Sequence, residues 1–377
     1  MSEAGVYLHI PFCKSRCSYC DFATDIFKSN EIVESYVDAL VKEISNFRFQ
    51  ISDSKIRVDT VYLGGGTPSL LSPKQLEKIL NAVHKTFDVA ENSEISIEMN
   101  PATMTLETVR AYRSLGVNRA SFGAQTFDDT ELKRLGRKHT ANDVRETIEL
   151  LREADFTNVS FDLIAGLPRQ TLQNWERNLD EALKLNPEHL SLYLLEISEG
   201  TPLAEQIRSG RQPQPDEDLC AEMYELIIEK TSAKNYAQYE ISNFSLPGFE
   251  SKHNPKHWTL DPIFGFGVSA HSFDGNERYA NESDTAKYVE MIEKNNSAEV
   301  YREKTDLASE FIFLGLRLSK GVDLENYKRR FGINLLEKYA EDLRRLEDLE
   351  LIETDGNYLK LTHKAKVYSN EVFQIFV

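Results

Sequence analysis

Short apolar runs alternate with longer amphipathic stretches through the first half of this 377-residue chain. Six of the runs have the length and the β-branched or aromatic content that are typical of buried strands. They span residues 5–10, 58–63, 94–99, 119–123, 159–164 and 190–195. Helical periodicity over residues 31–49 and 73–87, the latter capped by Ser72, separates the first three runs. The alternation predicts an α/β fold with a parallel sheet, and six repeats predict a partial (β/α)6 barrel.

The pattern changes after Gly200. Residues 210–216 form a proline-interrupted connector, and a helix is predicted from residue 216 to about residue 234. From about residue 306, helices alternate with short linkers, and residues 351–361 predict a hairpin that turns at Asp355-Gly356. These boundaries predict a barrel over residues 1–205, a connecting segment that completes the core over residues 206–304, and a mainly helical, winged-helix-like module over residues 305–377.

Composition and charge narrow the class of protein. Hydrophobic residues make up 41% of the chain, which is typical of a globular protein, and no apolar run approaches the roughly 18 residues that a membrane-spanning helix needs. The 61 acidic and 44 basic side chains give a formal charge of -17, which argues against nucleic acid or an anionic membrane as the main partner. The winged-helix-like module has no evident basic stripe, so we expect it to serve packing rather than DNA binding.

Three of the four cysteines lie close together, as Cys13, Cys17 and Cys20. Thiolates in the spacing C-x3-C-x2-C can hold three corners of a [4Fe-4S] cluster and leave one iron open to a substrate or cofactor. A structural zinc site that includes His9 is the alternative, although only Cys17 and Cys20 form the usual C-x2-C arm. A disulfide is disfavoured, because three neighbouring cysteines cannot all pair. Cys220 lies in a predicted helix, where we expect it to pack in the core.

Polar and glycine residues cluster where the predicted strands end. Three glycines precede Thr67 after the second strand, Glu98 ends the third, and Gln125 follows the fourth. In parallel α/β folds, sites form at the carboxyl ends of the strands. The glycines would let a ligand approach the backbone, and Asp162 in the fifth strand would need a buried partner. A tight turn, a surface glutamate at position 98 and a structural ion pair of Asp162 are the alternatives.

The cysteine spacing resembles that of the radical SAM superfamily. The sequence from Tyr7 to Cys13 resembles the opening of the oxygen-independent coproporphyrinogen III oxidase group, which includes the HemW heme chaperones. The resemblance extends from Gly5 to the mid-300s. It implies that the three cysteines bind a [4Fe-4S] cluster and that S-adenosylmethionine occupies the open iron. It also assigns S-adenosylmethionine contacts to Tyr7, Tyr19, Gly65, Gly66, Thr67, Glu98, Gln125, Arg137 and Asp162.

A second motif points to heme. His253, Asn254, His257 and Trp258 belong to a segment that resembles the H-N-x-x-Y-W segment of HemW proteins, in which the histidine is implicated in heme binding; His257 stands at the tyrosine position. Imidazole is a natural axial ligand of heme iron, and a tryptophan offers an apolar face to a porphyrin. By themselves, two histidines near an Asn-Pro turn would be structural. His271, in a glycine-rich segment that ends in Ala-His-Ser, is a secondary heme candidate or a core histidine.

Two features separate the relatives. The coproporphyrinogen oxidases carry a fourth motif cysteine where this chain has Phe22, and they have a longer segment before the cluster. Both differences favour a heme chaperone that binds heme and transfers it to acceptor hemoproteins, expected to be respiratory. The alternatives are an oxygen-independent coproporphyrinogen III oxidase and a noncatalytic, zinc-stapled α/β protein.

The resemblance and the cysteine usage also suggest partners and a location. We expect an electron donor, and a monomer or dimer that associates with membranes only transiently. We expect a cytoplasmic protein, because no presequence is evident and the clustered cysteines indicate a reducing compartment. Whether S-adenosylmethionine is cleaved, and whether one or two molecules bind, stays open at this point.

Overall fold

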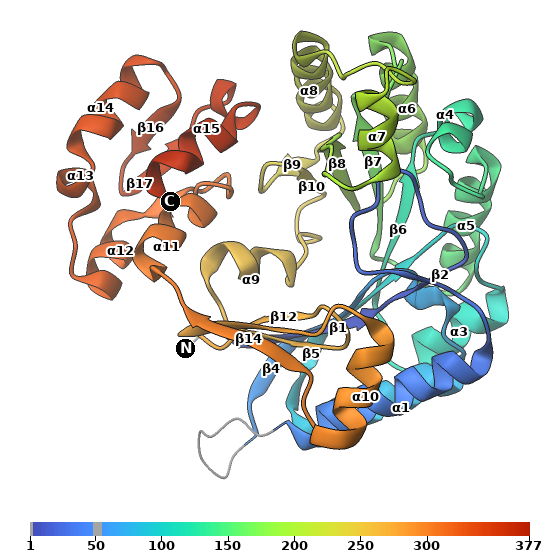
Figure 1. Cartoon of the computed structure of the whole chain (residues 1–377). Helices are drawn as coiled ribbons and strands as arrows, with labels where there is room; N and C mark the ends of the chain where they lie inside the picture. The colour runs from blue at the N-terminus through green and yellow to red at the C-terminus, as the bar shows by residue number, and fades with distance from the viewer. Residues whose placement is uncertain (1–2, 48–54) are drawn as a thin grey trace.

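The computed structural model describes residues 3–47 and 55–377. A twelve-stranded sheet forms its centre (Figure 1). Its strands are β1 (Ala4–Ile10), β4 (Arg57–Gly65), β5 (Asp88–Met99), β6 (Arg119–Gln125), β7 (Val159–Ala165), β8 (His189–Leu194), β9 (Ala237–Gln238), β10 (Asn243–Ser245), β11 (Ile263–Phe266), β12 (His271–Phe273), β13 (Glu277–Asn281) and β14 (Glu299–Lys304). From edge to edge the order is β14-β13-β12-β11-β1-β4-β5-β6-β7-β8-β10-β9. The strands from β11 through β1 to β8 run parallel, and those at both edges pair antiparallel.

The strands predicted for the barrel are all present, as β1, β4, β5, β6, β7 and β8, and they are neighbours in chain order. The α/β class and the partial (β/α)6 arrangement are therefore confirmed. The start of the third predicted strand is wrong, because β5 begins at Asp88 rather than at residue 94. The hydrophobic pattern also does not predict β11, a strand of 4 residues that pairs parallel with β1. Through β11 the connecting segment joins the central sheet.

Helices surround the parallel strands (Figure 1). They are α1 (Asn30–Asn46), α2 (Pro73–Thr86), α3 (Leu106–Ser114), α4 (Asp129–Arg134), α5 (Ala141–Glu153), α6 (Leu172–Lys184), α7 (Pro202–Arg208) and α8 (Glu217–Ser232). α1 buries Val33, Val37 and Ile44, which recur at helical spacing. Ser72 caps α2 through a capping box, as its place ahead of a proline predicts. Residues 48–49, the end of the first predicted helix, lie outside the described residues.

The C-terminal part of the chain has a second hydrophobic core. Its elements, with those of the segment before it, are α9 (Asn254–Thr259), α10 (Thr285–Asn295), α11 (Leu307–Gly315), α12 (Leu324–Phe331), α13 (Leu335–Lys338), α14 (Ala340–Asp348), α15 (Ser369–Phe373), β15 (Val322–Asp323), β16 (Ile352–Asp355) and β17 (Tyr358–Leu361). Leu260 and Phe273 of the connecting segment pack into this second core. The division of the chain near residues 205 and 305 stays a prediction.

The predicted hairpin near the C-terminus is formed by β16 and β17, but its predicted turn is shifted by one position. Asp355 pairs with Tyr358, so the loop consists of Gly356 and Asn357. Gly356 has a φ of +60°, in the left-handed region that glycine tolerates and two-residue hairpin loops require. Among the helices of the described residues, none combines the length and apolar character needed to cross a membrane.

Tyr36 of α1 ties the end of β1 to the segment after β11. Its hydroxyl donates to the His9 carbonyl at 2.7 Å and accepts from the Val268 backbone N–H at 3.0 Å. The side chain is fully buried. Because water cannot reach these two backbone groups, the Tyr36 hydroxyl provides the hydrogen bonds that water would otherwise make.

Replacing Tyr36 with phenylalanine should therefore destabilise the fold. The Tyr36→Phe change leaves a buried carbonyl and a buried N–H without this partner, and we expect the free energy of unfolding to fall by about 1–3 kcal/mol. Urea unfolding measures the loss. Tyr301→Phe on the exposed strand β14, where the hydroxyl bonds only Glu303, is the control and should change stability by less than about 0.5 kcal/mol. If Tyr36→Phe and Tyr301→Phe lowered the free energy of unfolding by the same amount, the prediction would be contradicted.

Candidate functional site

A cavity of about 480 Å³ lies at the carboxyl ends of the parallel strands. This is the end at which α/β folds build their sites. Most of the predicted cofactor residues line it together, namely Cys13, Cys17, Tyr19, Cys20, Gly65, Gly66, Glu98, Gln125, Arg137 and Asp162. They come from the loop after β1, from the ends of β4, β5 and β6, from within β7 and, for Arg137, from the segment between α4 and α5. The sequence motifs, although far apart in the chain, therefore meet in one place.

The cysteine loop is fixed at its ends and in its middle. Residues Phe12–Cys13 (β2) pair in parallel with Asp25–Ile26 (β3), which closes the loop at its base. In the middle, the Ser18 N–H donates to the Leu135 carbonyl at 2.9 Å, and the Ser18 carbonyl accepts from the Leu203 N–H at 2.8 Å. These bonds attach the loop to the ends of α4 and α7, so the thiols are held over the cavity.

The thiols themselves suit a cluster. Cys13 is buried, Cys17 and Cys20 are half-buried, and all three are free. Burial raises the pKa of the Cys13 and Cys20 thiols, so a bound metal group must displace their protons. No three Cys, His, Asp or Glu side chains of the described residues converge around one metal-ion position. The three thiols line one cavity, and soft sulfur ligands are those that iron-sulfur clusters take.

His9 is not available as the fourth ligand of a zinc site. Its Nε2–H donates to the Ala23 carbonyl at 2.9 Å, which leaves Nδ1 to accept from the Tyr7 hydroxyl at 3.1 Å. Burial lowers the pKa of His9, so the ring is neutral and both nitrogens are used. His9 therefore supports the cysteine loop and does not complete a Cys3His set. The Tyr7 ring stacks on Tyr62, whose hydroxyl bonds Glu98, and its contact with S-adenosylmethionine stays a prediction.

Gly65 and Gly66 allow the chain to pass close to the loop after β1. Gly65 has a φ of +109°, and a Cβ there would lie 2.6 Å from the His9 ring. A Cβ on Gly66 would lie 2.7 Å from the Pro11 backbone. Both positions therefore require glycine for a packing reason as well as for ligand access. Thr67 follows in an adjoining hollow of about 150 Å³ that it shares with Cys17 and Arg137.

Two carboxyl groups face the cavity. Glu98 accepts from the Tyr62 hydroxyl at 2.7 Å and from the Gly65 N–H at 3.0 Å, and burial raises its pKa to about 7, with a smaller contribution from the charge of Asp162. Burial likewise raises the pKa of Asp162 to about 6, against the opposing effects of Ser191, Arg119 and Arg137. Carboxyls so placed favour a ligand that brings an ammonium group or hydroxyl donors.

Sequence reasoning missed Asn100 and Tyr193, which also line this cavity. Asn100 follows the end of β5 directly after Glu98 and Met99, so its position was a usable signal. Its side chain donates to Thr67 Oγ1 at 2.8 Å and accepts from Arg137 at 2.9 Å. Tyr193 comes from β8, where nothing in the hydrophobic pattern distinguishes it from a core tyrosine.

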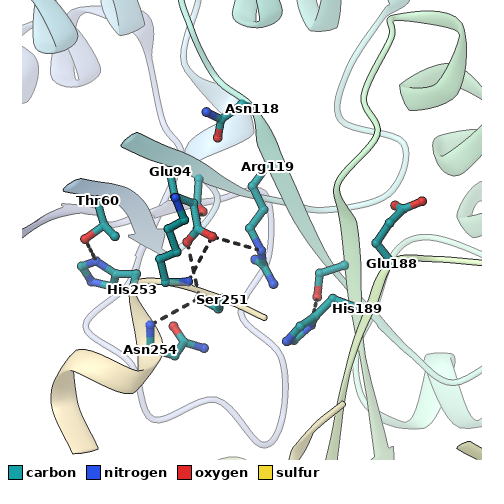
Figure 2. A network of polar contacts seen from close by, with 12 residues as sticks. Thr60, Glu94, Asn118, Arg119, Glu188, His189, Ser251, His253 and Asn254 are labelled. Atoms are coloured by element: carbon teal, nitrogen blue, oxygen red, sulfur yellow. Dashed lines mark hydrogen bonds and ion pairs between the residues drawn. The ribbon is translucent and has the colours of Figure 1, made fainter. Parts of the chain in front are cut away.

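Two heme candidates, His253 and Asn254, lie toward the other end of the strands (Figure 2). His253 is 2% exposed and its Nδ1 bonds Thr60 Oγ1 at 2.9 Å, near the beginning of β4. Its ring stacks on Tyr62 at a centroid distance of 5.0 Å, and the hydroxyl of Tyr62 reaches Glu98. One aromatic ring therefore lies between His253 and the carboxylate that faces the cysteine cavity.

A polar network holds the residues before His253 (Figure 2). Glu94 accepts from the Lys252 N–H at 3.1 Å and from the Ser251 hydroxyl at 3.4 Å, and it pairs with Arg119 at 3.9 Å. Both Glu94 and Arg119 are nearly fully buried. The segment is thus attached to β5 by hydrogen bonds to Glu94, whose buried ion pair with Arg119 of β6 is costly to break by removing one partner.

The other heme candidates differ in exposure. Asn254 and Trp258 are half-buried, and the His257 ring is exposed and lies 5.7 Å from that of His253. Arg317 stacks over Trp258 at 4.3 Å. His271 on β12 is exposed, which excludes its alternative role as a core histidine.

The architecture and the site together define a class. A partial barrel whose first strand leads into a C-x3-C-x2-C loop is the arrangement of the radical SAM proteins, and the Radical SAM superfamily model matches residues 7–182. The HemN C-terminal domain model matches residues 303–368. Full-length relatives are more specific: the heme chaperone HemW of Bacillus subtilis is 36% identical, with 99% of each chain covered, and that of Lactococcus lactis is 35% identical, covering 99% of this chain and 97% of the relative. This chain belongs to the HemW family.

A solved structure agrees in fold. Coproporphyrinogen III oxidase (HemN) from Escherichia coli, described as a radical SAM enzyme, superposes with a TM-score of 0.85 at 23% identity, covering 99% of this chain and 90% of the other. At this identity the likeness establishes the fold and carries no statement about the reaction.

The raised pKa of Glu98 predicts a pH-dependent penalty on stability. The native state keeps a proton up to about pH 7 that the unfolded chain releases near its ordinary pKa of 4.5, so this group's contribution to stability falls as the pH rises between these values. In the cluster-free protein, Glu98→Gln should gain stability relative to wild type as the pH rises from 4.5 to 7. Urea unfolding across this range measures the difference. The exposed Glu149→Gln on α5 is the control, and a Glu98→Gln difference that does not vary with pH would contradict the assignment.

Proposed function

We propose that this protein is a heme chaperone, which binds heme and passes it to acceptor hemoproteins with the help of a [4Fe-4S] cluster and S-adenosylmethionine. The observation that carries the proposal is the state of His253. Burial lowers its pKa well below the ordinary range, so the ring is neutral, and its buried Nε2 has no hydrogen-bond partner among the described residues. With Nδ1–H donated to Thr60, Nε2 keeps the lone pair that heme iron requires. The relatives named heme chaperone support the same function.

The cavity residues have distinct tasks in this proposal. Cys13, Cys17 and Cys20 would hold the cluster, and Glu98 and Asp162 would hold the polar groups of S-adenosylmethionine. Gly65 and Gly66 would leave backbone atoms open to the methionine part, and Gln125, Tyr19 and Arg137 would complete the lining. When bound, the cluster and S-adenosylmethionine supply one-electron chemistry that these side chains cannot perform. The chain's own contribution is to position both groups and to limit the access of water.

Heme entry at His253 requires the segment to move. The imidazole packs between Thr60, Tyr62 and His257, and Glu94 fixes the two preceding residues. Lys256 adds an ion pair to Asp59 at 2.8 Å. The exposed His257 and the half-buried Trp258 would meet the porphyrin first. His253 would become the ligand after these local contacts are released.

Phe22 weighs against the second candidate, oxidative decarboxylation of coproporphyrinogen III. It stands where the oxidases have a fourth motif cysteine, and it is 62% exposed at the rim of the cysteine cavity. Its side chain can offer an apolar surface to a ligand but no sulfur. The oxidase therefore stays the alternative function.

The proposal extends to partners and location. The acceptors would be respiratory hemoproteins, and a small redox protein would supply electrons. The charge of -17 supports protein and heme partners over nucleic acid, and allows only transient membrane contact. The four free thiols support a location in the reducing cytoplasm. The protein itself would be a monomer or a dimer.

Loss of one cluster ligand should abolish cluster assembly. After anaerobic reconstitution, wild type should carry about four irons and four sulfides per chain, and Cys17→Ala should carry almost none. Cys220→Ala is the matched control, because Cys220 packs against Gly166 away from the cavity lining and should not affect the content. Iron and sulfide analysis provides the measurement. If Cys17→Ala carried as much iron and sulfide as wild type, the assignment of the cluster to this loop would be wrong.

Heme binding should depend on His253. In anaerobic titrations of the cluster-loaded protein followed by the Soret band, we expect His253→Ala to bind heme at least tenfold more weakly than wild type. His257→Tyr, which installs the residue of the family motif, should retain binding, as should His271→Ala on exposed β12. If His253→Ala retained heme binding and His257→Tyr lost it, the axial ligand would be His257 instead of His253. No Soret band in wild type would refute the chaperone function.

A further inference from the structure

Two hydrogen bonds reach sulfur atoms of the cysteine loop from residues outside it. Thr67 Oγ1 donates to Cys13 Sγ at 3.4 Å, and Arg137 Nη1 donates to Cys17 Sγ at 3.5 Å. Sulfur accepts hydrogen bonds at longer distances than oxygen, and these lengths are within that range. Each bond therefore lies on a different cluster ligand.

One amide connects the two donors. Asn100 Oδ1 accepts from Arg137 Nη2 at 2.9 Å, and Asn100 Nδ2 donates to Thr67 Oγ1 at 2.8 Å. The direction of these bonds is fixed by chemistry, because a guanidinium has only donors and the oxygen of the amide must face it. The amide nitrogen then faces Thr67. Since the threonine hydroxyl already accepts this bond, its own hydrogen is free to point at Cys13.

The backbone of Asn100 is held firmly. The Asn100 N–H donates to Ser69 Oγ at 3.3 Å, and the Asn100 carbonyl accepts from Thr103 Oγ1 at 2.6 Å. The hydroxyls of Ser69 and Thr103 bond each other at 2.7 Å, and Thr67 is buried. Because its backbone is anchored in this way, Asn100 can present its side-chain amide to Thr67 and Arg137 from a fixed position.

We propose that Asn100 is a positioning residue that raises the reduction potential of the cluster on Cys13, Cys17 and Cys20, by aligning the Thr67 and Arg137 hydrogen bonds to two of its sulfur ligands. The inference rests on the cluster assignment of the proposed function. Hydrogen bonds to ligand sulfur withdraw electron density and favour the reduced state. The reduction adds one electron from an external donor, which is dithionite in the test, and no bond forms or breaks.

The test is a redox titration of the anaerobically reconstituted protein without S-adenosylmethionine, with mediators, dithionite and EPR detection of the reduced cluster. Asn100→Ala should keep the iron and sulfide content of wild type but have a more negative midpoint potential. At a fixed potential we expect the ratio of reduced to oxidised cluster to fall about tenfold, which corresponds to about 59 mV for one electron. Asn118→Ala is the matched control, because the Asn118 side chain bonds Ile95 and Ser93 at the opposite end of the strands, and its midpoint should equal that of wild type.

Thr67→Val supplies a second, narrower variant. It removes the donor to Cys13 together with the acceptor of the Asn100 amide, keeps the Asn100–Arg137 bond, and should lower the midpoint as well, so it carries the test if Asn100→Ala assembles no cluster. The double variant tests whether Asn100 acts through Thr67. If it does, Asn100→Ala should shift the midpoint potential less in the Thr67→Val background than in wild type. An unchanged midpoint in cluster-loaded Asn100→Ala or Thr67→Val would overturn the inference and leave the proposed function intact. Absence of a cluster in wild type would instead refute the cluster assignment, and the inference with it.

Discussion

The hydrogen bond from His9 to the Ala23 carbonyl is the contact on which the cysteine site depends. It joins the end of β1 to the far side of the cysteine loop, and the buried, neutral ring fills the space beside β4. Gly65 must then lack a Cβ, because the His9 ring occupies the position that this atom would take. A single imidazole thus accounts for the closure of the loop and for part of the glycine motif. A charged or absent ring at this position would disturb both at once.

The interior of the barrel is polar at both ends and aromatic between them. At the cavity end, desolvation raises the pKa values of the half-buried carboxyls Glu98 and Asp162. At the other end, Glu94 is paired with Arg119 and holds backbone and hydroxyl donors. The first carboxyls line a cavity, which suits a ligand, whereas Glu94 lies in the interior against Arg119 and the segment before His253, which suits a structural attachment. We therefore assign the network of Figure 2 to holding the His253 segment in place, and the cavity to binding a ligand.

Much of this could be predicted from the sequence, for identifiable reasons. The six barrel strands carry apolar runs long enough to stand out, and the carboxyl ends of parallel strands necessarily meet, which is why distant motifs converge on one cavity. β11 escaped prediction because a 4-residue strand gains its identity from pairing with β1, far away in the chain. Tyr7 was assigned to S-adenosylmethionine from its motif alone; its hydroxyl bonds His9 and its ring stacks on Tyr62, and its contact with the cofactor stays a prediction. The location of His253 depends wholly on tertiary packing, which no local pattern encodes.

The placement of His253 has a consequence for how heme and cluster chemistry relate. The two proposed sites lie at opposite ends of the strands, so heme held by His253 would not bind the open iron of the cluster directly. Tyr62 contacts both sites, because its ring stacks on His253 and its hydroxyl donates to Glu98. Movement of the His253 segment to admit heme would remove one face of the packing around Tyr62. The hydrogen bond that opposes protonation of Glu98 would weaken with it. The cofactor cavity and the heme segment therefore share one side chain through which occupancy of either site can affect the other.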